Sequence, residues 1–237
     1  MNIIITMAGK GTRFSGFREN LPKHMLSIVG KSMFEWAISS LKNFFSEHFI
    51  FIALNYADNE KFIEDKCKKL GINSYDTILI NQTTGGQAET ALLAEHTISN
   101  KEEPIIIYNI DTYVESDALT PSDLRGDGCV PCFKAEGTHW SFVEFGPDML
   151  IEKITEKVRI SEYGSIGLYY FKSFERFKQA VHSYYSGTTF TGEKYVAPVY
   201  NDLIIKGEKV YALVIDPKKV HVLGTPVEVE EFEKAFR

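Results

Sequence analysis

The sequence predicts an α/β protein, a Rossmann-like three-layer sandwich with a mixed, mostly parallel sheet. Two observations carry this prediction. In the first half of the chain, short β-branched runs alternate with segments of helical periodicity, an order that requires crossovers and places helices on both faces of a parallel sheet. In the second half, strand-like runs follow one another more closely, so we expect additional strands of mixed direction.

Four buried strands and three helices are expected in the first half. The strands are rich in β-branched and other apolar residues and lie at residues 3–6, 49–54, 76–81 and 104–110. The helices are indicated by apolar spacing or by end signals and lie at residues 34–45, 61–70 and 87–98. Gly71 directly follows the second helix, at the position where glycine commonly ends a helix.

The second half is expected to hold five strands and three helices. The strands lie at residues 129–134, 140–145, 150–155, 166–171 and 210–215. The helices lie at residues 174–185, 196–206 and 227–236. No Pro- or Ser-rich linker and no internal repeat interrupts the chain, so we expect a single domain over residues 1–237.

Composition excludes several classes of function. The formal net charge is -6 and no basic block is present, which argues against nucleic-acid binding. No stretch approaches the roughly 20 apolar residues that span a bilayer, and the start of the chain lacks the pattern of a signal peptide. We therefore expect a cytoplasmic protein that binds no membrane. Cys129 and Cys132 form a C-x-x-C inside an apolar run, so we interpret them as core residues rather than as a redox pair or half a zinc site.

A glycine-containing turn follows the first expected strand. Its residues are Ala8, Gly9, Lys10, Gly11, Thr12, Arg13 and Phe14. The spacing fits neither a P-loop nor the dinucleotide fingerprint, which would need glycine where Phe14 stands. What remains is G-x-G-T-R, followed ten residues later by Lys23. Backbone amides, one guanidinium and one ammonium fit the donors that a polyphosphate requires, whereas a plain surface turn is the structural alternative.

Two further segments follow expected strands. Gly85, Gly86 and Gln87 open the helix expected at residues 87–98, and free amides there suit a ligand, although a simple helix cap is the alternative. Asp111 directly follows the strand at residues 104–110. Ligands of open α/β sheets bind beyond the carboxyl ends of strands, and a carboxylate there can hold Mg²⁺ against phosphate oxygens. A turn aspartate is the alternative interpretation.

These motifs resemble those of the sugar-phosphate nucleotidyltransferases, the nucleoside-diphosphate-sugar pyrophosphorylases and their cytidylyltransferase relatives. The resemblance rests on G-K-G-T-R-F at residues 9–14, L-P-K at 21–23 and G-K-S-M-F-E-W at 30–36. It extends over nearly the whole chain, because E-K at residues 156–157, G-E-K-Y at 192–195 and L-G-T-P at 223–226 follow in order. It implies transfer of a nucleoside monophosphate from a triphosphate to a small phosphorylated acceptor, with release of pyrophosphate.

The resemblance also implies roles for particular residues. Residues 1–127 would form the nucleotide-binding half and residues 128–237 the acceptor-binding half. The expected nucleotide-binding residues are Ala8, Gly9, Gly11, Thr12, Arg13, Gly86 and Gln87. The expected catalytic residues are Arg13, Lys23, Asp111 and Lys157, with Mg²⁺ on Asp111. On the acceptor side we expect Trp140, Lys157, Glu193 and Lys194, although Trp140 also reads as a core tryptophan.

One departure from the family concerns the metal. Many relatives carry an aspartate just before Gly-Thr-Pro as a second ligand, but here that stretch is His221, Val222 and Leu223. Asp216 is the nearest upstream carboxylate and would take the role if the chain bulges there. His221 would face the acceptor or, as is common for a histidine in an apolar strand, serve the structure.

The stretch from Trp140 to Pro226 looks most like capsule-pathway cytidylyltransferases, including those that act on phosphoglutamine. This implies CTP as donor and a phosphoglutamine-like compound or a sugar 1-phosphate as acceptor. Two alternatives stay open. A nucleotide-sugar glycosyltransferase usually binds metal through Asp-x-Asp, which Asp111-Thr112-Tyr113 does not match. A non-catalytic regulatory module is favoured by the missing aspartate but opposed by Arg13, Lys23 and Asp111.

Overall fold

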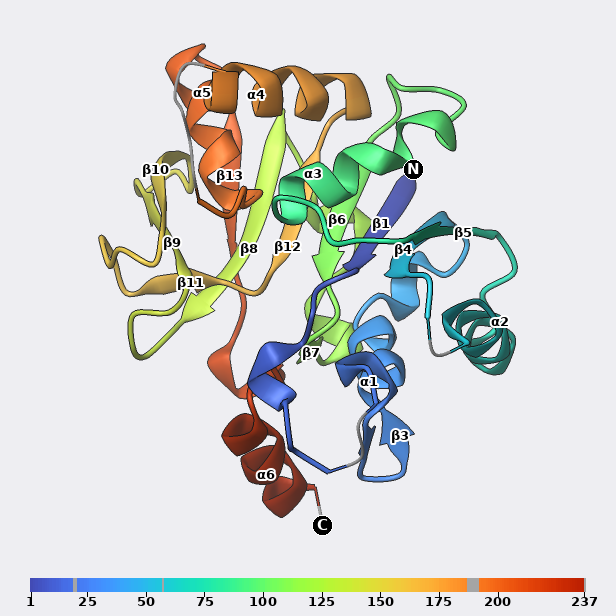
Figure 1. The fold of residues 1–237 in the computed structure, drawn as a ribbon. Helices are drawn as coiled ribbons and strands as arrows, with labels where there is room; N and C mark the ends of the chain where they lie inside the picture. The colour runs from blue at the N-terminus through green and yellow to red at the C-terminus, as the bar shows by residue number, and fades with distance from the viewer. Residues whose placement is uncertain (19–20, 57, 187–191, 237) are drawn as a thin grey trace.

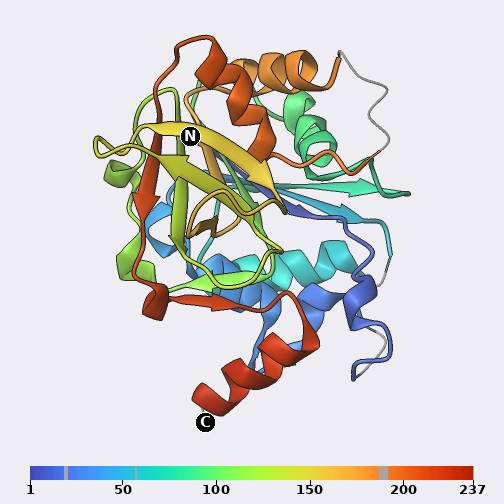
Figure 2. The same ribbon diagram turned by 90° about the vertical axis from the view of Figure 1, so that its left-hand side faces the viewer.

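A computed structural model describes residues 1–18, 21–56, 58–186 and 192–236. Helices cover both faces of a ten-stranded sheet, with α3, α4 and α5 on one side and α1 and α2 on the other (Figures 1 and 2). The expected three-layer α/β class is therefore confirmed. The helices are α1 (Met33–Ser39), α2 (Asn59–Leu70), α3 (Gln87–Leu92), α4 (Phe174–Ser186), α5 (Tyr200–Ile205) and α6 (Pro226–Ala235). Within the described residues, no helix is both long and apolar enough to cross a membrane.

The parallel part of the sheet is built by the first half of the chain. Its strands are β1 (Asn2–Met7), β4 (His48–Leu54), β5 (Tyr75–Ile80) and β6 (Ile105–Asn109). They pair in the order β5-β4-β1-β6, all parallel. The chain first adds β4 and β5 on one side of β1 and then returns to add β6 on the other side. This reversal makes a topological switch point at the carboxyl ends of β1 and β6, where ligands of such sheets bind.

The second half of the chain extends the same sheet with strands of mixed direction. These strands are β8 (Gly128–Lys134), β9 (Ser141–Phe145), β10 (Ile151–Glu156), β11 (Tyr163–Ser165), β12 (Leu168–Phe171) and β13 (Val210–Val214). β12 joins β6 in antiparallel fashion, β8 joins β12 and β11, and β13 runs parallel to β8. β9 and β10 form the far edge. The expectation of mixed direction in this half is confirmed.

Alternation along β1 divides the core between the two sheet faces. Ile3 and Ile5 pack with Phe34 and Ile63 of α1 and α2, whereas Ile4 packs on the opposite face with apolar residues of α3, α4 and α5. Side chains of a strand alternate in this way because their period is two. Both faces are covered, so the central strands β1, β4 and β6 are mostly apolar, as expected for parallel strands between helix layers.

Helices end earlier than their apolar spacing predicts. The helix expected at residues 34–45 ends at Ser39 and is followed by a 3₁₀ turn at Lys42–Phe44. Ser39 donates its hydroxyl to the carbonyl of Glu35 (2.5 Å), and the hydroxyl of Ser40 accepts the amide of Val114 (2.8 Å). Serine side chains that bond to backbone in this way compete with helix propagation. The helix expected at residues 87–98 likewise stops at Leu92 and gives way to a 3₁₀ turn.

Two small antiparallel pairs escaped the sequence analysis. They are β2 (Ser27–Ile28) with β3 (Lys31–Ser32), and β7 (Thr112–Val114) with β14 (Val220–Val222). Pairs of two or three residues are too short to show a period of two. The β7–β14 pair places the C-terminal segment beside Asp111, whose carbonyl accepts the amide of Leu223 (2.8 Å).

The C-x-x-C cysteines lie in β8 and contact opposite faces of the sheet. Cys129 belongs to the core on the α1 side and Cys132 to the core on the α4 side. Both are free thiols, and burial raises the pKa of Cys129 to about 11 and that of Cys132 to about 12. Thiols on opposite sheet faces cannot pair with each other. The interpretation as core residues is confirmed.

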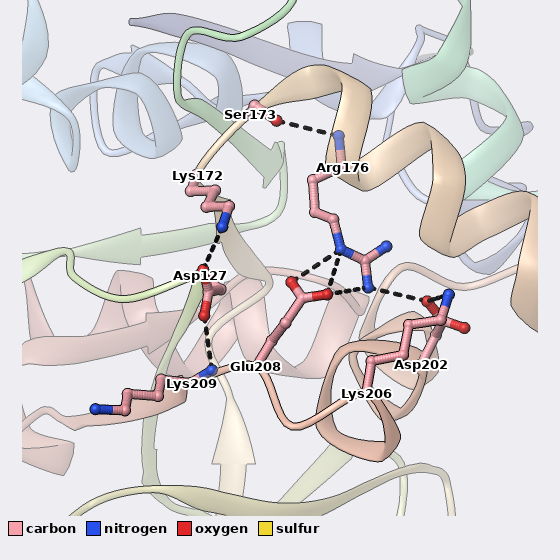
Figure 3. A network of polar contacts seen from close by, with 8 residues as sticks. All are labelled: Asp127, Lys172, Ser173, Arg176, Asp202, Lys206, Glu208 and Lys209. Atoms are coloured by element: carbon pink, nitrogen blue, oxygen red, sulfur yellow. Dashed lines mark hydrogen bonds and ion pairs between the residues drawn. The ribbon is translucent and has the colours of Figure 1, made fainter.

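A buried ionic network ties α4 to α5 and to the start of β13 (Figure 3). Nε of Arg176 donates to both carboxylate oxygens of Glu208 (2.6 and 2.8 Å), and its terminal nitrogen donates to Asp202 (3.1 Å). Lys206 also donates to Asp202 (2.9 Å). None of these residues lines the cleft described below, so the network belongs to the scaffold.

Candidate active site

A cleft of about 580 Å³ opens at the carboxyl ends of β1 and β6, at the switch point of the sheet. Both halves of the chain line it, as does the first turn of α6. The predicted site residues that line it are Ala8, Gly9, Gly11, Thr12, Arg13, Lys23, Gly86, Gln87, Asp111, Trp140, Lys157 and Glu193. Segments that are distant in sequence therefore meet at one edge of the sheet, because parallel strands bring their carboxyl ends together.

The glycine turn after β1 is anchored at its far end. Gly11 has a left-handed conformation (φ 63°), and its carbonyl accepts the amide of Phe14 (2.9 Å). Phe14 is buried in a separate apolar cluster with Val229 and Phe232 of α6. Figure 1 shows this turn, in blue, beside α6, in dark red. The buried ring fixes the turn, while Arg13 next to it stays exposed at the cleft.

Lys23 and Asp111 form an ion pair inside the cleft. Nζ of Lys23 lies 2.6 Å from Oδ2 of Asp111, and about a fifth of each side chain is exposed. Burial alone would raise the pKa of Asp111, but the charges of Lys23 and Arg13 outweigh it and hold that pKa below its ordinary value. Asp111 is therefore an anion at neutral pH, positioned where two cations converge.

A buried polar pair holds the segment that carries Lys23. The ring of His24 shares a hydrogen bond with Oδ1 of Asn59 (2.8 Å), and Asn59 donates to the carbonyl of Leu54 (2.6 Å). Burial lowers the pKa of His24 to about 4, so the imidazole is neutral at physiological pH. No pattern in the sequence links His24 to Asn59, so this support of Lys23 was not predicted.

Gly86 serves a purpose that the sequence did not indicate. Its φ is 147°, and a Cβ there would lie 2.4 Å from the backbone nitrogen of Lys194. The two segments are paired, because Lys194 donates its amide to Gly85 (2.8 Å) and accepts the amide of Ala88 (2.9 Å). One of the amides expected to be free for a base is thus already bonded. Glycine is required here for the close approach of two chain segments.

Gln87 lies across the ends of two strands. Its Nε2 donates to the hydroxyl of Thr6 in β1 (3.1 Å) and to Oδ1 of Asn109 in β6 (2.5 Å). A side chain fixed by two strand ends has a defined orientation, and Gln87 lines the cleft. Asn109 and Thr6 were not assigned a role from the sequence, although they lie two residues before Asp111 and Ala8.

Two of the residues expected on the acceptor side, Lys157 and Glu193, belong to a hydrogen-bonded chain. Lys157 donates to the hydroxyl of Tyr195 (2.5 Å), which donates to Glu193 (2.5 Å). Lys157 also lies 3.8 Å from Glu156, whose carboxylate accepts the hydroxyl of Ser141. Burial raises the pKa of Glu156 above its ordinary value. This end of the cleft therefore combines one ammonium with carboxylates and hydroxyls.

Trp140 packs against the core and also lines the cleft. Its indole N–H donates to the carbonyl of Glu136 (2.7 Å), and its ring packs edge-on against Phe133 at 5.2 Å. The residue is half-buried and lines the cleft. The ring of His139 packs against the same indole, with 4.6 Å between the ring centroids. Trp140 is thus a rigid wall supported by the core.

Two predicted residues do not line the cleft. Lys194 forms an ion pair with Glu89 (2.5 Å) and contributes its backbone to the pairing with Gly85. Asp216 is exposed on the turn after β13, where its carboxylate accepts the amide of Lys218 (2.9 Å). β13 stays in register with β8 up to Val214, so the bulge that would have turned Asp216 inward is absent from this strand. This geometry gives no support to Asp216 as a metal ligand.

His221 lies outside the cleft lining and stacks on Tyr113 at 5.4 Å, which supports the structural interpretation. In contrast, Glu228 of α6 lines the cleft and was not predicted. The only available signal was its position three residues after Thr225, which indicates a helix cap rather than a site.

A family model described as nucleotidyl transferase matches residues 2–214. A nucleoside-diphosphate-sugar pyrophosphorylase from Vibrio cholerae RC9 is 30% identical, with 99% of this chain and 100% of that chain covered and a TM-score of 0.91. The inositol-1-phosphate CTP transferase from T. maritima is similar in fold, at 16% identity, 98% and 94% coverage and a TM-score of 0.79.

Among curated proteins, the bifunctional protein GlmU of Methanococcus vannielii is 25% identical over 166 residues. The alignment covers 70% of this chain but 37% of that relative, so the chain spans little more than a third of its length.

Proposed function

Because the chain belongs to the nucleotidyl transferase family, we propose that it transfers a nucleoside monophosphate from a nucleoside triphosphate to a small phosphorylated acceptor and releases pyrophosphate. The observation that carries this proposal is the Lys23–Asp111 ion pair, which lies in the cleft beside Arg13 and the glycine turn. The ammonium of Lys23 and the carboxylate of Asp111 place a cation and an anion at one point of the cleft. Transfer between two anionic substrates would use the cation to bind phosphate and the anion to bind a metal ion.

The reaction needs little proton chemistry. The acceptor phosphate has a second pKa of about 6, so its attacking oxygen is already ionised at neutral pH. That oxygen bonds to the α-phosphorus of the triphosphate while the bond to pyrophosphate breaks. The barrier comes from repulsion between the two anions and from charge that accumulates around phosphorus. Positioning and electrostatic stabilisation are therefore the tasks of the protein.

The residues of the cleft suit these tasks. Backbone amides of Gly9 and Gly11 and the guanidinium of Arg13 would hold the triphosphate, and Lys23 would neutralise charge at the reacting phosphates. Gly86 and Gln87 would contact the base. Lys157, which also lines the cleft, would meet the acceptor phosphate with its ammonium.

A divalent cation fits the same site. Within the described residues, no three His, Cys, Asp or Glu side chains converge on one point. Mg²⁺ is usually held by one or two carboxylates together with substrate phosphates and water, so Asp111 suits it. Nearby, Oε2 of Glu228 is buried without a hydrogen-bond partner in the described chain, and a cation would satisfy such an atom. Bound Mg²⁺ would neutralise phosphate charge.

We further propose CTP as the donor and a phosphoglutamine-like compound or a sugar 1-phosphate as the acceptor. The choice of CTP rests on the likeness of residues 140–226 to capsule-pathway cytidylyltransferases. The acceptor class is supported by Glu156, Glu193 and Ser141, which line the cleft and whose oxygens would accept hydrogen bonds from sugar hydroxyls or from a carboxamide. A cytoplasmic place in capsule or surface polysaccharide synthesis belongs to the same proposal.

Pyrophosphate release tests these proposals. The protein is incubated with Mg²⁺, each common nucleoside triphosphate and a panel of phosphorylated acceptors, and release is expected to be fastest with CTP. Release only with UTP or dTTP and glucose 1-phosphate would overturn the cytidylyl assignment but retain the chemistry. Binding of nucleotide without turnover would favour the regulatory module, and sugar release from a nucleotide sugar would favour a glycosyltransferase.

A further inference from the structure

We propose that Glu228 is the second carboxylate for the divalent cation at Asp111, a role that the sequence suggested for Asp216. This inference rests on the proposed function. It starts from one atom: Oε2 of Glu228 is buried and has no hydrogen-bond partner among the described residues. Buried carboxylate oxygens are almost always bonded, so an unpartnered one in a ligand cleft calls for a partner that binds there.

Oε2 of Glu228 and the carboxylate of Asp111 both border one small space next to Gly224. A Cβ on Gly224 would lie 3.5 Å from Oε2 of Glu228 and 3.6 Å from Oδ2 of Asp111. It would lie 3.8 Å from the nearest terminal nitrogen of Arg13. Because residue 224 is glycine, this space between the two carboxylates stays open.

The backbone brings these groups together independently of any ligand. Leu223 donates its amide to the carbonyl of Asp111 (2.8 Å). This bond fixes the residue before Gly224 beside Asp111, just after the end of β6. Thr225 caps α6 by accepting the amide of Glu228 (3.3 Å). Val229 and Phe232 fix the helix in the apolar cluster that also holds Phe14. Glu228 is thus held on a rigid element.

Glu228 and Glu35 stand at the same position relative to a helix cap, but their side chains are oriented differently. Glu35 and Glu228 each lie three residues after a capping hydroxyl, in Ser32-x-x-Glu35 and Thr225-x-x-Glu228. The Glu35 carboxylate folds back and accepts the backbone amide of Ser32 (2.8 Å), which completes a capping box. Glu228 instead leaves Oε2 without a donor and lines the cleft. The cap alone therefore does not account for its side chain.

Charge at the cleft favours a cation between the two carboxylates. Lys23 pairs with Asp111 at 2.6 Å, whereas Oε1 of Glu228 has Nε2 of His139 at 3.9 Å, a longer contact that is ionic only when the imidazole is protonated. A carboxylate that faces another carboxylate is repelled unless a cation separates them. Oxygen ligands of this kind are those that Mg²⁺ and Mn²⁺ accept together with phosphate oxygens.

The test measures how much Mn²⁺ tightens binding of α,β-methylene-CTP, by calorimetry with and without the metal. In Glu228→Gln we expect this metal-dependent gain to fall about tenfold or more, with the metal-free affinity equal or tighter because an anion has been removed. Asp111→Asn should lose the gain as well. The matched control is Glu230→Gln, an exposed carboxylate on the same helix, which should behave as wild type.

A fall in metal-free affinity together with an unchanged gain would assign Glu228 to structure or to nucleotide contact and overturn the inference. The inference would also be overturned if Glu228→Gln kept the wild-type metal-dependent gain in affinity while Asp111→Asn lost it. If Glu228→Gln fails to fold, Gly224→Ala replaces it, because a methyl group in the space between the carboxylates should also reduce the gain. Wild-type protein that binds no nucleotide analogue would contradict the proposed function itself.

Discussion

At the residue scale, the proposed chemistry depends on a few charged side chains that the fold has brought within reach of one another. Lys23 comes from a loop after β1 and Asp111 from the end of β6, yet they lie 2.6 Å apart. Each is partly exposed, so neither contributes much to stability through the pair. Their proximity is instead suited to binding phosphate and metal.

Lys23→Ala and Asp111→Asn should each remove most nucleotidyl transfer while the fold stays intact. Groups that stabilise charge in a transition state are commonly worth about 3–4 kcal/mol, or about 10²–10³-fold in kcat. Pyrophosphate release and thermal unfolding should be measured side by side. Turnover near the wild-type rate in either variant would remove that residue from the mechanism.

Gly86 decides the local structure because it has no side chain. Gly86→Ala would place a methyl group 2.4 Å from the Lys194 backbone and should unpair the two segments. We expect a loss of about 3 kcal/mol, against about 1 kcal/mol for Gly71→Ala, because Gly71 also has a positive φ but open space around it. Urea unfolding of both variants measures the difference. Equal losses would mean that backbone strain alone, and not the clash, sets the cost.

At the element scale, α1 and α2 are joined by one buried carboxylate. Glu35 completes the cap of α1 and forms ion pairs with Lys66 (2.8 Å) and Lys69 (2.6 Å) of α2. Burial by itself would raise the pKa of Glu35, but the two lysines and the bonds from Ser32 lower it to about 2. The folded state therefore strongly prefers the ionised carboxylate.

This preference predicts a pH-dependent contribution to stability. A folded pKa below the unfolded value of about 4.5 adds stability that is complete above about pH 5 and is lost as pH falls toward 2. Glu35→Gln should therefore cost about 3 kcal/mol at pH 7 and progressively less in acid. Urea unfolding from pH 7 to pH 3 measures this, with the exposed Glu64→Gln as control. A difference between wild type and variant that stayed constant with pH would show that ionisation is not its source.

At the scale of the whole molecule, scaffold and site are separate. The Arg176 network fastens α4 and α5 to the sheet (Figure 3), and none of its members lines the cleft. The Asp202 side chain in it is 9% exposed, and Arg176 and Lys206 both bond to it. Removing one partner of a buried ion pair leaves a charge that water cannot reach.

Arg176→Met should therefore lower the free energy of unfolding by about 3–5 kcal/mol while nucleotide affinity stays unchanged. The loss should shrink when Asp202→Asn is combined with it, because the buried carboxylate that has lost its Arg176 partner and retains Lys206 is then neutral. Denaturant unfolding and calorimetric nucleotide titration separate the two properties. A weaker nucleotide affinity in a folded Arg176→Met protein would show that the network reaches the site.

Local patterns in the sequence were sufficient for the layered α/β architecture and for most strands and helices. Apolar runs and helical spacing indicate which residues are buried. Strands such as β1 and β6 are buried, so these patterns were enough to predict them. The motif residues at Gly9, Arg13, Lys23 and Asp111 were also recognisable, because each stands at a strand end or turn where ligands bind.

The tertiary structure alone decided which side chains meet. Asp216 is closer in sequence to Gly-Thr-Pro than any other upstream carboxylate, yet its turn holds it at the surface. Glu228, which reads as a helix cap, reaches the cleft because β7 pairs with β14 and α6 packs on Phe14. Such contacts join residues over a hundred positions apart, and they depend on how elements pack in space rather than on any period along the chain.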